Sequence, residues 1–211
     1  MTSPICPLCN SAAILFCDKP KHLFYKCSNC EGIFRPKHTF LTAEKEKDHY
    51  EKHNNDVFDE RYQAFVSPIV NAVLHDFSPE AKGLDFGSGT GPVIAKMLTD
   101  KDFQVQNYDL FFANEPSLLN QKYDYVSCCE VMEHFHHPYQ EFELLKSLLL
   151  PKGKLYCKTE VYTNQKPFEN WYYKDDFTHV FIYQPKTLEW IKNEFHFSKL
   201  LIKEKLIVFE N

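Results

Sequence analysis

A glycine-rich turn between an apolar strand and a helix constrains this chain more than any other feature. Residues 84–91 read Leu-Asp-Phe-Gly-Ser-Gly-Thr-Gly and are followed by Pro92 and an apolar helical run. Glycine lacks the Cβ atom that would keep a ligand off the backbone, and it allows a tight strand-to-helix turn. Proline suits the first helical position, where an N–H group would have no partner. The turn therefore predicts a nucleotide-binding loop in an α/β sheet.

The spacing of the glycines narrows the kind of ligand. Gly87, Gly89 and Gly91 alternate, whereas a dinucleotide-binding fingerprint carries its third glycine one residue later. A phosphate-binding loop is not indicated either, because no Gly-Lys-Ser/Thr follows. Residues 104–109 predict a second strand that ends in Asp109, where a carboxylate can accept hydrogen bonds from both ribose hydroxyls of a nucleotide. The alternative is an ordinary glycine turn and a solvated carboxylate at a strand end.

Two further segments complete a family pattern. Residues 123–135 read Tyr-Asp-Tyr-Val-Ser-Cys-Cys-Glu-Val-Met-Glu-His-Phe, and residues 148–155 read Leu-Leu-Leu-Pro-Lys-Gly-Lys-Leu. With the glycine turn and the following carboxylate, they resemble class I S-adenosylmethionine-dependent methyltransferases in kind and in order. The resemblance implies a Rossmann-like, doubly wound α/β sheet with S-adenosylmethionine as cofactor. The cofactor-binding residues that it implies are Asp85, Gly87, Ser88, Gly89, Thr90, Gly91, Asp109, Leu110, Cys129 and Glu130.

One stretch departs from the family pattern. Only 13 residues separate Asp109 from Tyr123, where many relatives fit a helix and a third strand. We therefore expect the third strand to be abbreviated or absent. The contact to the adenine amino group cannot be assigned to that strand, and we expect backbone or aromatic groups near Phe111, Phe112 or Cys129 to replace it.

The first part of the chain carries a different signal. Cys6, Cys9, Cys27 and Cys30 form two Cys-x-x-Cys pairs separated by residues 10–26. Four thiolates at this spacing can surround one Zn²⁺, which predicts a zinc ribbon with a structural, closed metal site. Disulfides or a redox pair are the alternatives. The N-terminus has no signal-peptide pattern, so we expect a cytoplasmic, reducing location that disfavours disulfides.

Composition agrees with a division into three parts. We predict a zinc ribbon at residues 1–42, a helical linker or lid at 43–80, and the S-adenosylmethionine-binding domain at 81–211. A module of about 40 residues needs such a metal because it buries too little apolar surface to fold alone. The ribbon carries five basic and two acidic side chains, and the net charge of the chain is −5. This balance argues against a nucleic-acid partner. The absence of a long apolar run argues against a membrane span.

The linker is predicted to contain two helices. Residues 42–56 are densely charged and predict an exposed helix. Residues 62–77 predict an amphipathic helix with Phe65, Ile69, Val73 and Leu74 on its buried stripe. The string His-Tyr-Glu-Lys-His-Asn at residues 49–54 resembles a segment of small zinc-ribbon methyltransferases that closes over the cofactor. An exposed linker is the alternative.

An aromatic loop is the second substrate-side candidate. Residues 171–181 read Trp-Tyr-Tyr-Lys-Asp-Asp-Phe-Thr-His-Val-Phe and follow a predicted strand. Ligands bind beyond the carboxyl ends of strands in open α/β sheets. A histidine there can take a proton from an acceptor hydroxyl, so His179 and His134 are the catalytic candidates; hydrogen-bonded structural histidines are the alternative. The substrate-binding candidates are Tyr50, His53, Asn54, Glu133, Trp171 and Tyr173, and His136 and His137 are expected at the surface.

These observations favour a methyltransferase with a small-molecule acceptor, anionic or aromatic, that is methylated on oxygen or carbon. The chain resembles enzymes of quinol and sugar methylation, although fold analogy does not fix the acceptor. An RNA-modifying methyltransferase is one alternative, and the acidic balance of residues 43–211 argues against it. A non-catalytic zinc-ribbon binding protein with a vestigial cofactor pocket is the other.

Overall fold

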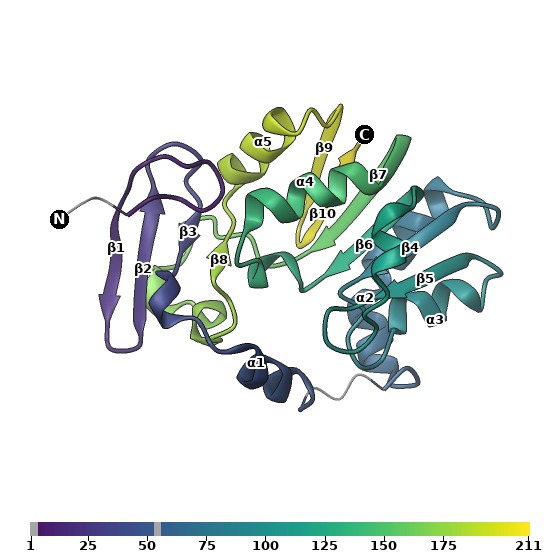
Figure 1. The fold of residues 1–211 in the computed structure, drawn as a ribbon, viewed down its shortest axis with the longest axis horizontal. Coiled ribbons are helices and arrows are strands. Elements are labelled where there is room, and N and C mark those ends of the chain that lie inside the picture. Colours follow the sequence, from purple (N-terminus) through teal and green to yellow (C-terminus); the bar gives the residue numbers. More distant parts are fainter. Residues whose placement is uncertain (1–3, 53–55) are drawn as a thin grey trace.

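The computed structural model describes residues 4–52 and 56–211. Six strands form a mixed sheet in the order β5-β4-β6-β7-β10-β9 (Figure 1). Their bounds are β4 (Lys82–Phe86), β5 (Gln104–Tyr108), β6 (Tyr123–Cys129), β7 (Leu149–Lys158), β9 (Lys199–Lys203) and β10 (Leu206–Glu210). The predicted α/β fold is confirmed.

The carboxyl ends of four parallel strands, β5, β4, β6 and β7, lie on the same side of this sheet. Strand β4 runs parallel to β5 and β6, and β6 runs parallel to β7. Strand β10 is antiparallel to both β7 and β9, so the chain ends in a hairpin at the edge of the sheet. Between β5 and β6 the described chain forms only the short 3₁₀ helix η2 (Pro116–Asn120), so the third strand is absent rather than shortened. The sheet consequently ends at β5.

Helices cover both faces of the sheet. Helices α2 (Glu60–Asp76) and α3 (Val93–Thr99) pack on one face, and α4 (Pro138–Leu148) and α5 (Pro185–Glu194) pack on the other. The buried side of α2 consists of Val66, Ile69, Val70 and Val73. The predicted stripe is wrong at Phe65, which is 37% exposed and lies under the ammonium of Lys158. That aromatic ring borders the cavity described below instead of joining the core.

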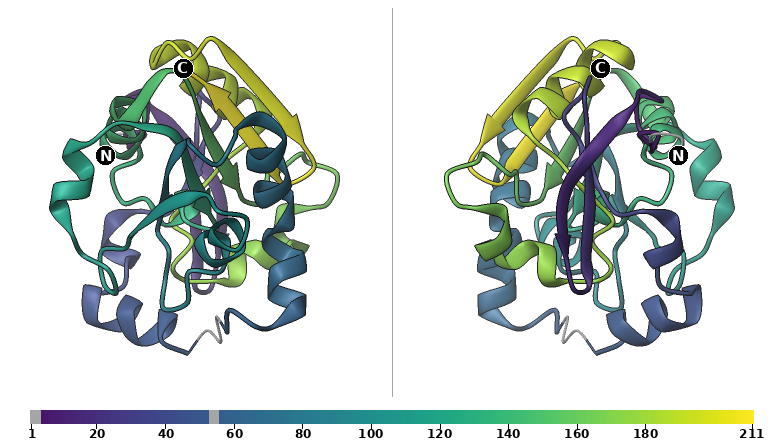
Figure 2. Two further views of the ribbon diagram at one scale, coloured as in Figure 1. Left: turned by 90° about the vertical axis from the view of Figure 1, so that its right-hand side faces the viewer. Right: turned by 90° about the vertical axis from the view of Figure 1, so that its left-hand side faces the viewer.

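The N-terminal module is joined to the far end of the chain. Strands β1 (Ala13–Lys19), β2 (His22–Cys27) and β3 (Ile33–Phe34) form an antiparallel sheet, and β8 (Phe181–Ile182) completes it beside β3. A Cβ atom on Gly32 would lie 2.3 Å from the ring of Phe181, so only glycine allows this approach. Figure 2 shows the β1–β2 hairpin standing against the rest of the molecule. The predicted domain boundaries stay a prediction, and β8 crosses them.

The linker helix α1 (Ala43–Tyr50) lies across the open side of the parallel strand ends (Figure 1). Thr42 caps it by accepting a hydrogen bond from the Lys45 amide, which is the usual role of a threonine before a first helical turn. Two 3₁₀ helices, η3 (Met132–His134) and η5 (Tyr172–Asp175), face it from the strand side. In the described part of the chain, no helix is long and apolar enough to cross a membrane.

Candidate active site

A cavity of about 1130 Å³ opens at the carboxyl ends of the parallel strands, beneath α1. Such crevices are where open α/β sheets bind ligands. The cavity brings together predicted site residues from five separate parts of the chain. Those that line it are Tyr50, Gly87, Ser88, Gly89, Thr90, Asp109, Leu110, Cys129, Glu130, His134, Tyr173 and His179.

The glycine turn at the end of β4 is held in one conformation. Gly87 and Gly89 have φ angles of +77° and +65°, which residues other than glycine rarely adopt. The carboxylate of Asp109 accepts hydrogen bonds from the Gly89 amide at Oδ2, and from the Phe111 and Phe112 amides at Oδ1. Since each carboxylate oxygen has about two acceptor positions, one remains on Oδ2. Asp109 therefore fixes the turn and still offers an acceptor to a ligand.

Asp85 lies under this turn rather than in the large cavity. Its carboxylate is 4% exposed and accepts a hydrogen bond of 2.7 Å from the Ser127 hydroxyl. Together with Gly91 it lines a much smaller cavity that shares Gly87, Ser88 and Cys129 with the large one. Burial raises the pKa of Asp85 to about 6, although the bond from Ser127 opposes the shift.

We expect the stability of Asp85→Asn, relative to the unsubstituted protein, to rise between about pH 4 and pH 6 and then to level off. The raised pKa means that the folded state binds the proton more tightly than the unfolded chain does. The stability that this proton provides is complete below pH 4 and is lost as the pH rises through 6, whereas asparagine does not titrate. Thermal unfolding across this range, without cofactor, measures the effect. Exposed Asp100→Asn is the control, and parallel curves for Asp85→Asn and the unsubstituted protein would contradict the prediction.

Two histidines face the cavity with fixed tautomers. His179 places Nδ1 2.7 Å from the carbonyl oxygen of Tyr173, and His134 places Nδ1 3.0 Å from that of Thr178. A carbonyl only accepts, so both Nδ1 atoms carry the hydrogen and both Nε2 atoms are left to accept a proton. Burial lowers the pKa of His179, and it lowers that of His134 to about 3 with help from the neighbouring His179. Both rings are therefore neutral at neutral pH.

Asp176 lies on the Nε2 side of His179, 3.8 Å away. Burial alone would raise the pKa of Asp176, but hydrogen bonds from Thr178 and the nearby His179 lower it to about 2. An ionised carboxylate at this distance stabilises the protonated ring. Of the two histidines, His179 is consequently the better placed to take up a proton.

A buried acid network lies behind the histidines. The hydroxyl of Tyr173 contacts a carboxylate oxygen of Glu133, lies 3.0 Å from Glu130 and lies 2.9 Å from the Thr159 hydroxyl. Glu133 is fully buried, burial raises its pKa well above the usual range, and its Oε2 has no hydrogen-bond partner among the described residues. One tyrosine proton cannot serve two carboxylates, so the proton retained by Glu133 completes the network. Glu133 itself does not line the cavity.

The structure separates the remaining substrate-side candidates. Tyr50 packs its ring against Phe111 and His134, which closes one side of the cavity. His53 and Asn54 lie outside the described residues. Trp171 is buried against Tyr162 and Tyr173 and does not line the cavity, so packing is its role in the described structure.

Sequence reasoning did not single out several residues that line the cavity. His136, expected at the surface, lies 2.8 Å from a carboxylate oxygen of Glu46 and packs its ring, tilted, against Phe40. Asp176 could have been found from its place in the aromatic loop, but Lys205 comes from the β9–β10 turn, which carries no motif. The lining residues without a predicted site role include Glu46, Lys52, Tyr62, Phe65, His136, His137, Glu141, Tyr172, Asp176 and Lys205.

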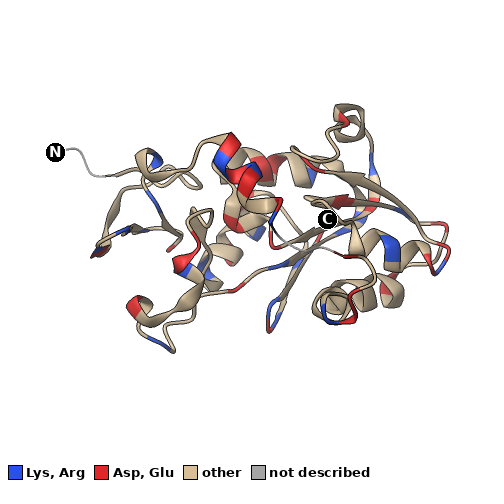
Figure 3. Cartoon of the chain, turned by 90° about the horizontal axis from the view of Figure 1, so that it is seen from below, with Lys and Arg blue, Asp and Glu red and all other residues tan. Residues whose placement is uncertain are grey.

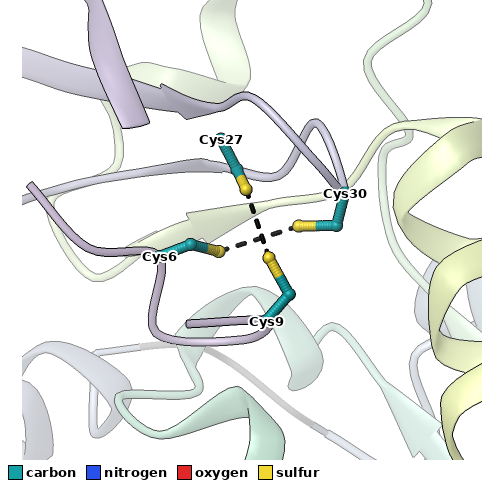
Figure 4. Close-up of side chains that lie close together, drawn as sticks. All are labelled: Cys6, Cys9, Cys27 and Cys30. Carbon is teal, nitrogen blue, oxygen red and sulfur yellow. Dashed lines mark hydrogen bonds between the residues drawn. The ribbon is translucent and has the colours of Figure 1, made fainter. Parts of the chain in front are cut away.

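The four N-terminal cysteines converge on one point (Figure 4). Their Sγ atoms all lie within 4.8 Å of one another, with 3.7 Å between Cys6 and Cys30 and 3.2 Å between Cys9 and Cys27. Tetrahedral thiolates at about 2.3 Å from a zinc ion would be about 3.8 Å apart. All eight cysteines are free thiols, so the alternative of disulfides is not realised. The donor set and its spacing fit a zinc ion.

Comparison with known proteins identifies the family. Residues 58–201 match the family model of a methyltransferase domain. The chain belongs to this methyltransferase family. The predicted enzyme class is thus confirmed, and the match contains the glycine turn, Asp109 and both histidines. No curated protein matches the sequence.

Solved structures of other methyltransferases share the fold at low identity. A SAM-dependent methyltransferase from Archaeoglobus fulgidus has a TM-score of 0.57 at 15% identity and covers 75% of this chain and 100% of its own. An O-methyltransferase family protein from Burkholderia thailandensis has a TM-score of 0.55 at 11% identity, and the alignment covers 78% of this chain and 61% of that protein. Human N-acetylserotonin methyltransferase, solved with SAM, has a TM-score of 0.55 at 13% identity, and the alignment covers 81% of this chain and 60% of that enzyme. The chain thus spans about three fifths of the last two proteins.

Proposed function

We propose that this methyltransferase transfers the methyl group of S-adenosylmethionine to a small-molecule acceptor. The observation that carries the proposal is a single cavity that holds both the Gly87–Gly89 turn with Asp109 and the unprotonated Nε2 of His179. The first set suits a nucleoside with its ribose, and the second suits an acceptor that must lose a proton. The human N-acetylserotonin enzyme solved with SAM supports the choice of cofactor by its fold.

The protein residues have three tasks in this proposal. The cofactor supplies a methyl group that is already electrophilic, so alignment and exclusion of water matter most. Asp109 and the glycine turn hold the nucleoside, and Tyr50 at the end of α1 shields the cavity from water. His179 takes the proton of an acceptor hydroxyl at Nε2, and the nearby Asp176 stabilises the ring that results.

The lining favours an aromatic or anionic acceptor and methylation on oxygen. Among the described residues, ten phenylalanine and tyrosine side chains border the cavity: Tyr50, Tyr62, Phe65, Phe86, Tyr108, Phe111, Phe112, Phe135, Tyr172 and Tyr173. Such walls bind flat apolar rings. Lys52 and Lys205 add two cations that an anionic group can meet. A neutral histidine can take the proton that a hydroxyl acceptor loses on methylation, which favours an oxygen acceptor over a carbon acceptor.

An RNA substrate finds little support in the charge distribution. Lysine and arginine positions are scattered along the chain and mixed with aspartate and glutamate positions (Figure 3). RNA-binding surfaces instead need a continuous basic face for phosphate contacts. The acids Glu46, Glu130, Glu141 and Asp176 also lie at the cavity, where they repel a backbone of several phosphates more strongly than a single anionic group.

The cysteine cluster is proposed to hold structural Zn²⁺. Cys6, Cys27 and Cys30 are fully buried, and the Asn29 amide donates to the sulfur of Cys27 at 3.4 Å. Four sulfur ligands close the coordination sphere and leave no position for a substrate. The metal would therefore stabilise the ribbon without taking part in the reaction.

Calorimetric titration of the zinc-loaded protein with S-adenosylmethionine, and separately with NAD, tests the cofactor. We expect binding of S-adenosylmethionine in the micromolar range and none of NAD, because the turn lacks the dinucleotide spacing. Quinols and anionic sugars are then screened as acceptors by release of the demethylated cofactor. Binding of NAD, or of neither compound, would overturn the cofactor assignment.

A further inference from the structure

The side chain of Arg35 follows β3 of the N-terminal module and is 2% exposed. A buried guanidinium normally pairs with a carboxylate, but none of the described residues forms an ion pair with Arg35. The guanidinium carbon instead lies 4.3 Å from the ring centroid of Phe24 and 5.4 Å from that of Phe177. Its hydrogen bonds must therefore explain why an arginine is buried there.

Those bonds go to the main chain of the aromatic loop. Nε donates to the carbonyl of His179 at 3.1 Å, and Nη2 donates to those of Lys174 at 2.7 Å and Asp176 at 3.4 Å. Nη1 donates to the Lys21 carbonyl at 3.1 Å, which anchors the group to the β1–β2 hairpin. The loop thus wraps around one guanidinium, with three carbonyl oxygens pointing at it. Without that cation the three dipoles would repel one another in a buried space.

We propose that Arg35 is a positioning residue: it folds residues 173–180 around its guanidinium and thereby holds His179 with Nε2 toward the cavity. Two other contacts act with it, since the Arg35 amide donates to the Val180 carbonyl at 2.9 Å and β3 pairs with β8. The N-terminal module would then serve the active site by shaping this loop, without touching cofactor or acceptor.

Lysine could not replace this arginine fully. The guanidinium is planar and donates in several fixed directions, whereas a lysine ammonium is a single point at the end of a flexible stem. Four carbonyls in different directions need the planar group. We therefore expect Arg35→Lys to retain part of the effect of the charge and lose part of the geometry, and Arg35→Met to lose both.

The state of His179 offers a readout that a merely structural role would not move. The titratable groups facing it are Asp176, Glu130, His134 and Arg35, and its Nδ1 is tied to the Tyr173 carbonyl. Arg35 lowers the pKa of His179 through its positive charge. Losing that charge favours the protonated ring, so the pKa of His179 should rise.

The experiment compares zinc-loaded Arg35→Met and Arg35→Lys with the unsubstituted protein and with Arg61→Met. Arg61 is the other arginine of the chain, and its side chain is 92% exposed. Histidine NMR, assigned with His179→Gln, follows the pKa of His179, and hydrogen exchange follows the amides of residues 178–181. We expect Arg35→Met to raise that pKa by about half a unit or more and to speed exchange on the order of tenfold. Arg35→Lys should give intermediate values, and Arg61→Met should change neither.

Unchanged exchange and an unchanged His179 pKa in a folded Arg35→Met would overturn the proposal. So would equal effects in Arg61→Met. The catalytic meaning of the loop geometry rests on the proposed function, but neither readout requires an acceptor or turnover. Titration of the same samples with S-adenosylmethionine distinguishes the two proposals. The unsubstituted protein must bind the cofactor for the proposed function to stand. The affinity of Arg35→Met is expected to stay within about threefold of that value, because the aromatic loop and the glycine turn are separate.

Discussion

Asp109→Ala is expected to lower the affinity for S-adenosylmethionine at least about a hundredfold. The carboxylate accepts three main-chain hydrogen bonds that shape the glycine turn, from Gly89, Phe111 and Phe112. A hydrogen bond to a charged group contributes about 1.5–3 kcal/mol, and about 1.4 kcal/mol corresponds to a factor of ten in affinity. The substitution removes these bonds and the remaining acceptor of Oδ2 together. The loss therefore combines a disordered turn with a missing ligand contact.

Calorimetry and thermal unfolding separate those two causes. Asp109→Asn keeps one acceptor oxygen, so we expect it to lose less affinity than Asp109→Ala but to destabilise the turn. Asp100→Ala is the matched control because Asp100 is exposed, pairs only with Lys96 among the described residues and does not line the cavity. Full affinity in Asp109→Ala would contradict the assignment of this cavity edge to the nucleoside.

The parts of the fold that local sequence determines were predictable. The glycine turn and the apolar strand before it depend on residues close together in the chain, and the structure confirms them. The missing third strand followed from length alone, since 13 residues cannot hold a helix and a strand before Tyr123. The cysteine cluster likewise follows from the spacing of its two pairs, because each pair occupies a single tight turn.

The parts that depend on distant contacts were not predictable. Strands β3 and β8 have two residues each, too few to show an alternating pattern. They pair with one another although most of the chain separates them in sequence. Arg35 has no local signal because its partners lie near residues 174–179. The stripe of α2 fails at Phe65 for a related reason: the open cavity beside the helix, rather than helical periodicity, decides which apolar side chain stays exposed.

Cys30→Ser is expected to release the zinc and to unfold the N-terminal module at room temperature. Metal binding supplies about 10–16 kcal/mol to small zinc modules, which is as large as the total stability of about 5–15 kcal/mol of a typical domain. Cys30 is fully buried and its sulfur is 3.7 Å from that of Cys6, so no other ligand can take its place without moving the chain. Cys17→Ser is the control, since Cys17 is also buried in this module but lies outside the cluster.

The consequence should extend beyond the ribbon. Because β3 pairs with β8 and Arg35 holds the aromatic loop, loss of the metal is expected to increase hydrogen exchange at residues 173–182 as well as 5–34. Protection of β4 and β5 should persist, because those strands form the opposite end of the larger sheet (Figure 1). Zinc content by mass spectrometry, exchange, and S-adenosylmethionine affinity are measured on the same samples. A metal-free Cys30→Ser that keeps its loop protection would mean that the four thiols pack as an ordinary core and that the loop needs no metal.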